Sequence, residues 1–257
     1  MKPTIISFPP NTAITHFAQP GFHTGTPNLT HAEIIPAHIR AVLQNRWEMI
    51  HPQRAIGLNG LRNVFVVGEG LVFDQDGNLY AESISQNSEQ QIETAYDQLR
   101  DRLHTKNIRY YPGATLLCGK AGLSNYGHWM LEMLPIAYLC RQWIAQGWDI
   151  YVPKLHGWME EVIPTSLALL GIEPGRCAYG DGQPWFFQDL VYTSGLSIVG
   201  LYYPPVALET MRAISENVPG QDDERIWIAR FDHAGLHRSM VDEVALCRHL
   251  STKGCAS

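Results

Sequence analysis

The chain has 257 residues, of which 45% are hydrophobic and 17% charged, a composition typical of a globular protein with a substantial core and unlike that of a disordered chain. Its formal net charge of −6 argues against a nucleic-acid-binding protein, because affinity for a phosphate backbone depends on lysine and arginine. The 5 cysteines are widely spread and include no Cys-x-x-Cys pair, which excludes an evident zinc site or disulfide framework and indicates a reducing, cytoplasmic location.

The first 60 residues are interrupted by prolines at positions 9, 10, 20, 27 and 36 and by several glycines. Because both residue types end regular elements, residues 1–60 are predicted to form a loop-rich lead-in with one short helix near residues 38–47. From residue 61 the sequence changes to short β-rich runs separated by turn residues, at 64–67, 71–73 and 79–80. These runs predict a small β-meander.

The turn between the last two runs contains Asp74 and Asp76. Their spacing resembles the Asp-x-Asp motif that holds a metal and a nucleotide diphosphate in one large class of glycosyltransferases. The flanking strands and the dipeptide Asp76-Gly77 favour a hairpin turn instead, because these residues tolerate a positive φ. We therefore expect a turn here and no metal site.

After the meander, the pattern predicts alternating helices and strands. Residues 88–105 form the clearest amphipathic helix, with apolar residues at helical spacing: Ile92, Ala95, Tyr96, Leu99 and Leu103. The apolar run 114–118 predicts a buried strand, and a glycine-bearing loop leads from it towards a helix start. This order places ligands at the carboxyl ends of strands, and the alternation that continues to residue 217 predicts an α/β fold with a largely parallel sheet.

The segment 124–135 begins with a helix-start signal. Ser124 or Asn125 can cap a helix, because either side chain can accept a hydrogen bond from a free backbone N–H group. Trp129 and Met133 then follow at helical spacing. We expect the helix to be kinked or restarted at Pro135, since proline lacks the N–H group and clashes with the preceding turn.

His128 and Glu132 are one helical turn apart in this segment, and Asn125 shares their face. A carboxylate at this distance can hold the imidazole of His128 in one tautomer. An oriented, neutral imidazole is suited to act as a general base. The alternative interpretation is an ordinary pair on the surface of a helix, whose tryptophan and methionine belong to the core.

The same residues resemble the signature of glycosyltransferase family 61, a family of capsular polysaccharide biosynthesis-like proteins, in the pattern Asn-Tyr-x-His-Trp-x-x-Glu-x-x-Pro that is matched by Asn125, Tyr126, His128, Trp129, Glu132 and Pro135. The resemblance implies the metal-independent, two-domain GT-B architecture. It also implies that His128 or Glu132 is the catalytic base and that Asn125, Tyr126 and Trp129 bind substrate.

A second motif follows a polar stretch rich in proline and glycine at 218–224, which is the best linker candidate. The strand predicted from Arg225 ends at Arg230, and Arg238 precedes a helix start, so both guanidinium groups are suited to hold a phosphate. The family pattern Ile-Tyr-Ile-Ser-Arg…Arg…Asn-Glu is matched here by Ile226, Trp227, Ile228, Arg230, Arg238 and Glu243. Ala229 and Asp242 depart from it.

These observations predict a GT-B-like α/β protein. Residues 61–217 are expected to form its first, acceptor-side Rossmann-like domain with the meander at its start, and 225–257 only the first βα unit of a donor-binding domain. The stretch from Arg225 to Ser257 is too short for a complete nucleotide-binding domain, which suggests a truncated sequence.

The expected function is transfer of a sugar from a nucleotide-sugar donor to a glycan or other hydroxyl acceptor, with inversion and without a metal or resident cofactor. The partners are then the donor and the acceptor. No run of residues reaches the ~18 apolar positions that a membrane span needs, so the chain is expected to be cytoplasmic, and peripheral membrane association stays open. The alternative is a non-catalytic acceptor- or partner-binding domain, or an inactive fragment that lacks the donor site.

Overall fold

The computed structural model describes residues 2–18, 21, 32–50, 55–196 and 204–218. By its internal contacts the chain divides into two compact units, 1–217 and 218–257, and all of the described helices and strands belong to the first unit. The predicted linker lies outside the described residues apart from Val218, and so does the whole of the predicted second domain, 225–257.

The first unit alternates strands and helices from residue 56 onward. Its strands are β1 (Ile5–Ile6), β2 (Ala13–Phe17), β3 (Ile56–Val67), β4 (Leu71–Phe73), β5 (Leu79–Tyr80), β6 (Arg109–Leu117), β7 (Asp149–Val152), β8 (Cys177–Tyr179) and β9 (Trp185–Ser194). Its α-helices are α1 (Ala37–Glu48), α2 (Glu89–Thr105), α3 (Tyr126–His128), α4 (Leu134–Leu139), α5 (Arg141–Ala145), α6 (Met159–Leu169) and α7 (Pro205–Ser215). Short 3₁₀ turns occur at Ala32–Ile34, Ala81–Ser83 and Pro174–Arg176, and a π-helical turn at Trp129–Met133.

All described strands belong to one mixed sheet with the order β1-β5-β4-β3-β9-β6-β7-β8, and β2 pairs with β3. The strands β9, β6, β7 and β8 are mutually parallel, whereas β3, β4 and β5 form an antiparallel meander. The two parts join where β3 pairs antiparallel with β9. The predicted α/β class and the meander are thus confirmed, and the sheet is parallel in one part only.

The predicted lead-in contributes more to the sheet than its prolines suggested. β1 pairs with β5, β2 pairs with β3, and β3 itself begins at Ile56, so the expected boundary at residue 60 falls inside a strand. Glycine and asparagine in the first half of β3 conceal it, because both residue types are typical of turns. The short helix predicted near 38–47 is confirmed as α1, which has no buried residue.

The aspartates after β4 form the predicted turn. Asp74 Oδ1 accepts hydrogen bonds from the backbone N–H groups of Asp76, at 3.0 Å, and Asn78, at 2.8 Å. Gly77 has a φ of 82°, a conformation that favours glycine. The Asp74 carboxylate is therefore engaged in closing the connection between β4 and β5.

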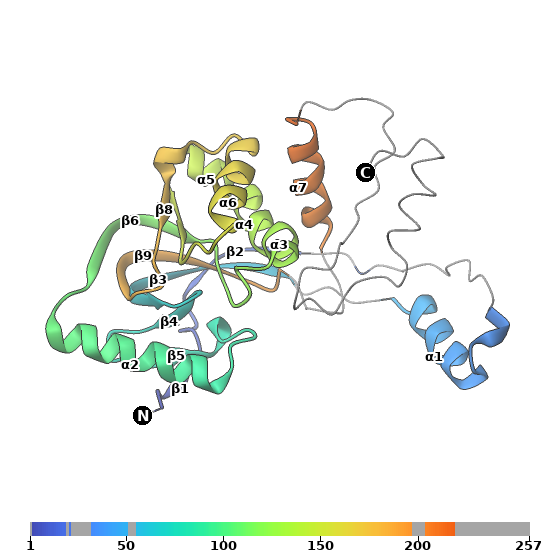
Figure 1. Cartoon of the computed structure of the whole chain (residues 1–257), viewed down its shortest axis with the longest axis horizontal. Helices are drawn as coiled ribbons and strands as arrows, with labels where there is room; N and C mark the ends of the chain where they lie inside the picture. Colours follow the sequence, from blue (N-terminus) through green and yellow to red (C-terminus); the bar gives the residue numbers. More distant parts are fainter. Residues whose placement is uncertain (1, 19–20, 22–31, 51–54, 197–203, 219–257) are drawn as a thin grey trace. The chain divides into compact units, whose positions relative to one another are not determined.

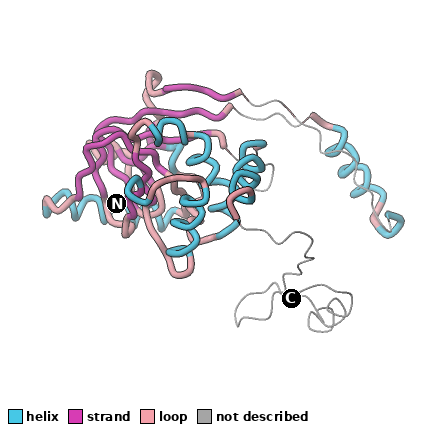
Figure 2. Tube along the Cα trace, turned by 90° about the horizontal axis from the view of Figure 1, so that it is seen from above, coloured by secondary structure: helices cyan, strands magenta, loops and turns pink. Residues whose placement is uncertain are grey.

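Two groups of helices pack against different parts of the sheet. The amphipathic helix predicted at 88–105 is confirmed as α2, which starts with a capping box between Ser88 and Gln91 and buries Ala95 and Leu99 against the meander. The helices α4, α6 and α7 bury their apolar faces against β6, β7 and β9. In Figure 1, α2 runs below the strands and α4 to α7 lie above them, and Figure 2 shows the latter group from above.

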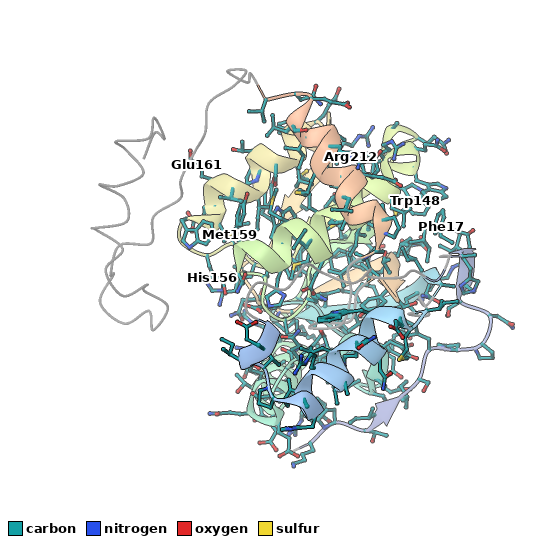
Figure 3. All side chains as sticks on the ribbon, turned by 90° about the vertical axis from the view of Figure 1, so that its right-hand side faces the viewer. Phe17, Trp148, His156, Met159, Glu161 and Arg212 are labelled. Atoms are coloured by element: carbon teal, nitrogen blue, oxygen red, sulfur yellow. The ribbon has the colours of Figure 1, made fainter. Side chains whose placement is uncertain are left out.

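Aromatic rings attach β2 to the second group of helices. Phe17 packs edge-on against Trp143 of α5, with 6.4 Å between ring centroids, and Trp143 stacks on Trp148 at 5.7 Å. Figure 3 shows Phe17 and Trp148 on the same side of the molecule. The contact fixes one end of the helical layer relative to the sheet.

The candidate site lies where β6 and β7 end. These neighbouring strands are parallel, with Leu117 opposite Tyr151, so the loops that follow them start side by side. The first loop, 118–125, leads to α3, and the second, 153–158, leads to α6. This is the edge at which α/β sheets usually bind ligands.

Candidate functional site

Asn125 caps the helix that carries the central motif. Its Oδ1 accepts hydrogen bonds from the backbone N–H groups of Gly127, at 2.9 Å, and His128, at 3.4 Å. Its backbone is extended, with φ −97° and ψ 121°, as expected for a residue that precedes a helix. The predicted helix start is confirmed, and of the two residues considered for the cap Asn125 fills it. Its side chain is engaged in this structural role.

The helix changes register before Pro135. The segment Trp129–Met133 is a π-helical turn, in which the N–H group of Leu134 donates to the carbonyl of Trp129 five residues earlier. A normal α-helical ladder cannot continue through proline, which has no N–H group and crowds the preceding turn. The predicted interruption at Pro135 is therefore confirmed as a widened turn followed by α4.

Within this turn Glu132 is buried between two nitrogen-bearing side chains. The residue is 1% exposed, and its Oε1 lies 2.7 Å from His128 Nδ1. Its Oε2 forms an ion pair with the ammonium group of Lys120, from the loop after β6. Burial alone would raise the pKa of Glu132, but the hydrogen bonds from Lys120 and His128 outweigh it, so the pKa is lowered. Glu132 is thus held as a carboxylate.

His128 is oriented by that carboxylate. Because Nδ1 faces Glu132, a neutral ring carries its proton on Nδ1 and presents the lone pair on Nε2. The side chain is 21% exposed, whereas that of Glu132 is inaccessible. Of the two predicted candidates, this geometry favours His128 as the base and gives Glu132 the task of orienting it.

Gly122 forms the wall behind the imidazole. A β-carbon at this position would lie 2.9 Å from His128 Cδ2, closer than van der Waals contact allows. The residue has a φ of 90°, and its N–H group donates to Glu69 Oε2 at 2.8 Å. Glycine is required here both by the backbone conformation and by the nearness of the ring.

Replacing Gly122 with alanine is expected to displace the His128 ring and to lower the free energy of unfolding by about 1–3 kcal/mol, because the side chain must occupy a strained backbone region and collides with the imidazole. The matched control is Gly147→Ala, since Gly147 has a φ of 113° and open space around it. NMR signals of the His128 ring should move in Gly122→Ala only. Unchanged ring signals in that variant would contradict the proposed contact.

Trp129, predicted to bind substrate, lies in the core instead. Its side chain is fully buried, and its Nε1–H group donates to Ser166 Oγ of α6 at 2.8 Å. Ser166 Oγ in turn donates to the carbonyl of Ile163. The indole has no surface left for a ligand. Trp129 directly follows His128, and consecutive side chains of a helix point in different directions, so the indole faces α6.

Tyr126 is exposed and pairs with a residue that the sequence analysis did not assign to the site. Its ring centroid lies 6.0 Å from that of Trp158, the residue before α6, and the planes are inclined by 33°. Both residues are exposed, at 50% for Tyr126 and 58% for Trp158. We call this pair of rings the aromatic platform: Tyr126 precedes His128 by two residues in α3, and Trp158 precedes α6.

Three further residues join the site through contacts between loops. Lys120 forms the ion pair with Glu132. Glu69, from the β3–β4 turn, accepts a hydrogen bond from the Gly122 N–H group. The Glu69 carboxylate also lies 3.9 Å from His156 Nε2. Figure 3 shows His156 close to Met159 at the start of α6. None of these contacts is encoded by local spacing, so the sequence analysis missed them; only the order of the strands brings them together.

The remaining predicted residues, Arg230 and Arg238, lie outside the described part of the chain. Among the described residues no group of three or more His, Cys, Asp or Glu side chains is arranged to hold a metal ion. The helices of this same part include none that is long and apolar enough to cross a membrane.

Comparisons with models of protein families, with curated proteins and with solved structures give no match.

Proposed function

We propose that this chain carries the acceptor-activating part of an inverting, metal-independent glycosyltransferase, which moves a sugar from a nucleotide-sugar donor to a hydroxyl group of a glycan or other acceptor. The observation that carries the proposal is the buried, ionised carboxylate of Glu132, 2.7 Å from His128 Nδ1. It leaves His128 Nε2 as a proton acceptor. The same segment holds the residues that resemble glycosyltransferase family 61.

In the proposed reaction, the acceptor oxygen attacks the anomeric carbon of the donor while its proton moves to His128 Nε2. The bond between that carbon and the diphosphate oxygen breaks, and the nucleoside diphosphate leaves with the electron pair. Attack from the side opposite the leaving group inverts the anomeric configuration. Glu132 stabilises the imidazolium that forms, because a carboxylate beside Nδ1 favours the cationic ring.

Arg230 and Arg238 are proposed to bind the departing diphosphate, since guanidinium groups form paired, charge-assisted hydrogen bonds with phosphate. In this proposal residues 61–217 act as the acceptor-side, Rossmann-like domain of a GT-B architecture, and residues from 225 begin the donor side. The parallel strands β9, β6, β7 and β8, with helices packed against them, support the assignment of the first domain.

The aromatic platform of Tyr126 and Trp158 supports an acceptor that contains a sugar ring. Aromatic rings combine a large apolar face with a polar edge, and the C–H groups of a pyranose pack on such faces. The platform also favours a second candidate function, in which the chain binds a glycan without transferring sugar to it. The two functions differ in whether a nucleotide-sugar is consumed.

The test is to incubate the protein with UDP-, GDP-, dTDP- and CMP-sugars, with and without a mixture of neutral oligosaccharides, and to measure the nucleotide released. Release that increases with an acceptor is the expected result. Binding of oligosaccharides without release from any donor would favour the second function. Neither binding nor release would contradict both.

A further inference from the structure

A separate cleft of about 390 Å³ lies beside the site, between α2, the β3–β4 turn and the loop that connects β8 to β9. Its volume is in the range of pockets that bind small molecules. Neutral amide side chains form much of its lining, from Asn87, Gln90, Gln91, Gln98 and Gln183. The lining contains no aromatic ring that could stack on a nucleobase.

The wall formed by α2 is a neutral polar stripe. Gln90, Thr94 and Gln98 follow one another at intervals of four residues and all line the cleft, so they share one face of the helix. Charged residues of the same turns lie off this stripe, as Glu89 and Glu93 do in their pairs with Lys2. The side-chain amides of Gln90 and Gln98 make no hydrogen bond within the described part of the chain, which leaves their donors and acceptors to a ligand.

The opposite wall is held in place by backbone and side-chain hydrogen bonds. Gln183 Oε1 accepts a hydrogen bond from Arg102 at 3.1 Å, which turns the NH₂ group of Gln183 away from the arginine. The Gly182 N–H group donates to the Pro153 carbonyl, and the Gly182 carbonyl accepts from Gly68. The cleft is therefore preformed, so ligand binding need not order these loops.

The charges around the cleft do not favour a phosphate. Lys154 is the cation in its lining, and it is accompanied by the carboxylates of Glu69 and Asp181. Asp181 lies 3.5 Å from Arg109, which offsets part of its charge. Without an excess of positive charge, and with amides that both donate and accept, the cleft is suited to neutral hydroxyl groups.

Glu69 connects this cleft with the candidate site. It lines the cleft, and its Oε2 accepts the N–H group of Gly122, where an added β-carbon would collide with the His128 ring. Lys154 belongs to the loop that continues to His156 and to Trp158 of the aromatic platform. Glu69 therefore contacts both the cleft and the loop that lies against the His128 ring.

We propose that this cleft is a saccharide-binding subsite, which holds neutral, hydroxyl-rich sugar units of an oligosaccharide acceptor while its terminal hydroxyl group lies at His128. The inference rests on the proposed function for the role of the bound saccharide as an acceptor. The existence of the binding site itself does not depend on it.

The test is NMR titration of the full chain with neutral tetrasaccharides, namely cellotetraose, xylotetraose, maltotetraose and chitotetraose, followed through the side-chain amide signals of glutamine. At least one is expected to shift the signals of Gln90, Gln98 and Gln183. The double variant Gln90→Leu/Gln98→Leu should bind it about 10-fold more weakly, because each lost hydrogen bond contributes about 0.5–1.5 kcal/mol. The control Gln142→Leu, on α5, should leave the affinity unchanged.

Failure to shift any cleft amide with all four tetrasaccharides, or equal affinity in the double variant, would overturn the subsite. Shifts of the same amides caused by UDP or GDP alone would overturn it too, since they would identify a nucleotide site. The proposed function fails separately: saccharide binding that depends on Gln90 and Gln98 without any sugar transfer would leave the subsite standing and remove the transferase.

Discussion

The variant His128→Gln is expected to transfer sugar roughly 10²–10⁴-fold more slowly than the wild-type chain while keeping its fold, because glutamine can accept a hydrogen bond but cannot take up the acceptor proton. The measurement is the initial rate of nucleotide release with a saturating acceptor, together with a thermal unfolding curve for each protein. The effect should appear in kcat, since the proton is transferred in the transition state and not on binding.

The matched control is His104→Gln, because His104 lies exposed in the last turn of α2 and belongs to neither the site nor the cleft. It should retain the wild-type rate. A His128→Gln protein that is folded and transfers sugar at the rate of this control would remove His128 as the base.

Replacing Lys120 with methionine is expected to lower the free energy of unfolding by about 3–5 kcal/mol at neutral pH, because it leaves the buried carboxylate of Glu132 without its cationic partner. Urea unfolding of the two proteins measures the difference. Lys2→Met is the control: Lys2 pairs with Glu89 at 2.7 Å, but their side chains are 62% and 81% exposed, so its loss should leave the free energy of unfolding nearly unchanged.

The difference in the free energy of unfolding between Lys120→Met and the wild type should become smaller as the pH is lowered. The pKa of Glu132 is lowered on folding from its ordinary value of 4.5, so its ion pairs stabilise the folded state above that value and are lost as the pH falls through the lower, folded-state pKa. Below that point both proteins lack the ionised carboxylate. A stability difference that stays constant from neutral pH to well below 4.5 would contradict the role of Lys120.

Local spacing in the sequence was sufficient to predict parts of the fold and of the site. The cap at Asn125 and the contact between His128 and Glu132 join residues two to four apart, so the backbone geometry of one helical turn determines them. Whether the last contact is catalytic stays a prediction.

Contacts between strand ends could not be predicted in this way. Lys120 follows β6, and its ion pair with Glu132 depends on how the loop after β6 folds. Glu69 belongs to the β3–β4 turn, and its hydrogen bond with Gly122 depends on the order of the strands in the sheet. No periodicity in one sequence specifies that order. Trp129 could not be assigned correctly either. Its place beside His128 in the motif suggested contact with a ligand, but its burial depends on packing against α6, which is distant in the sequence.

The π-helical turn at Trp129–Met133 amounts to one inserted residue in an otherwise regular helix. Because of the insertion, the two halves of the helix differ in the direction of their side chains. The half after it packs Leu134 and Ala137 into the core, and the half before it places His128 against Gly122 of the loop after β6. Deleting one residue of this turn would restore a regular α-helix and rotate the first half by about 100° relative to the second. The imidazole would then face elsewhere, and the Trp129 indole would leave its place beside Ser166, so the inserted residue sets both the direction of His128 and the packing of Trp129.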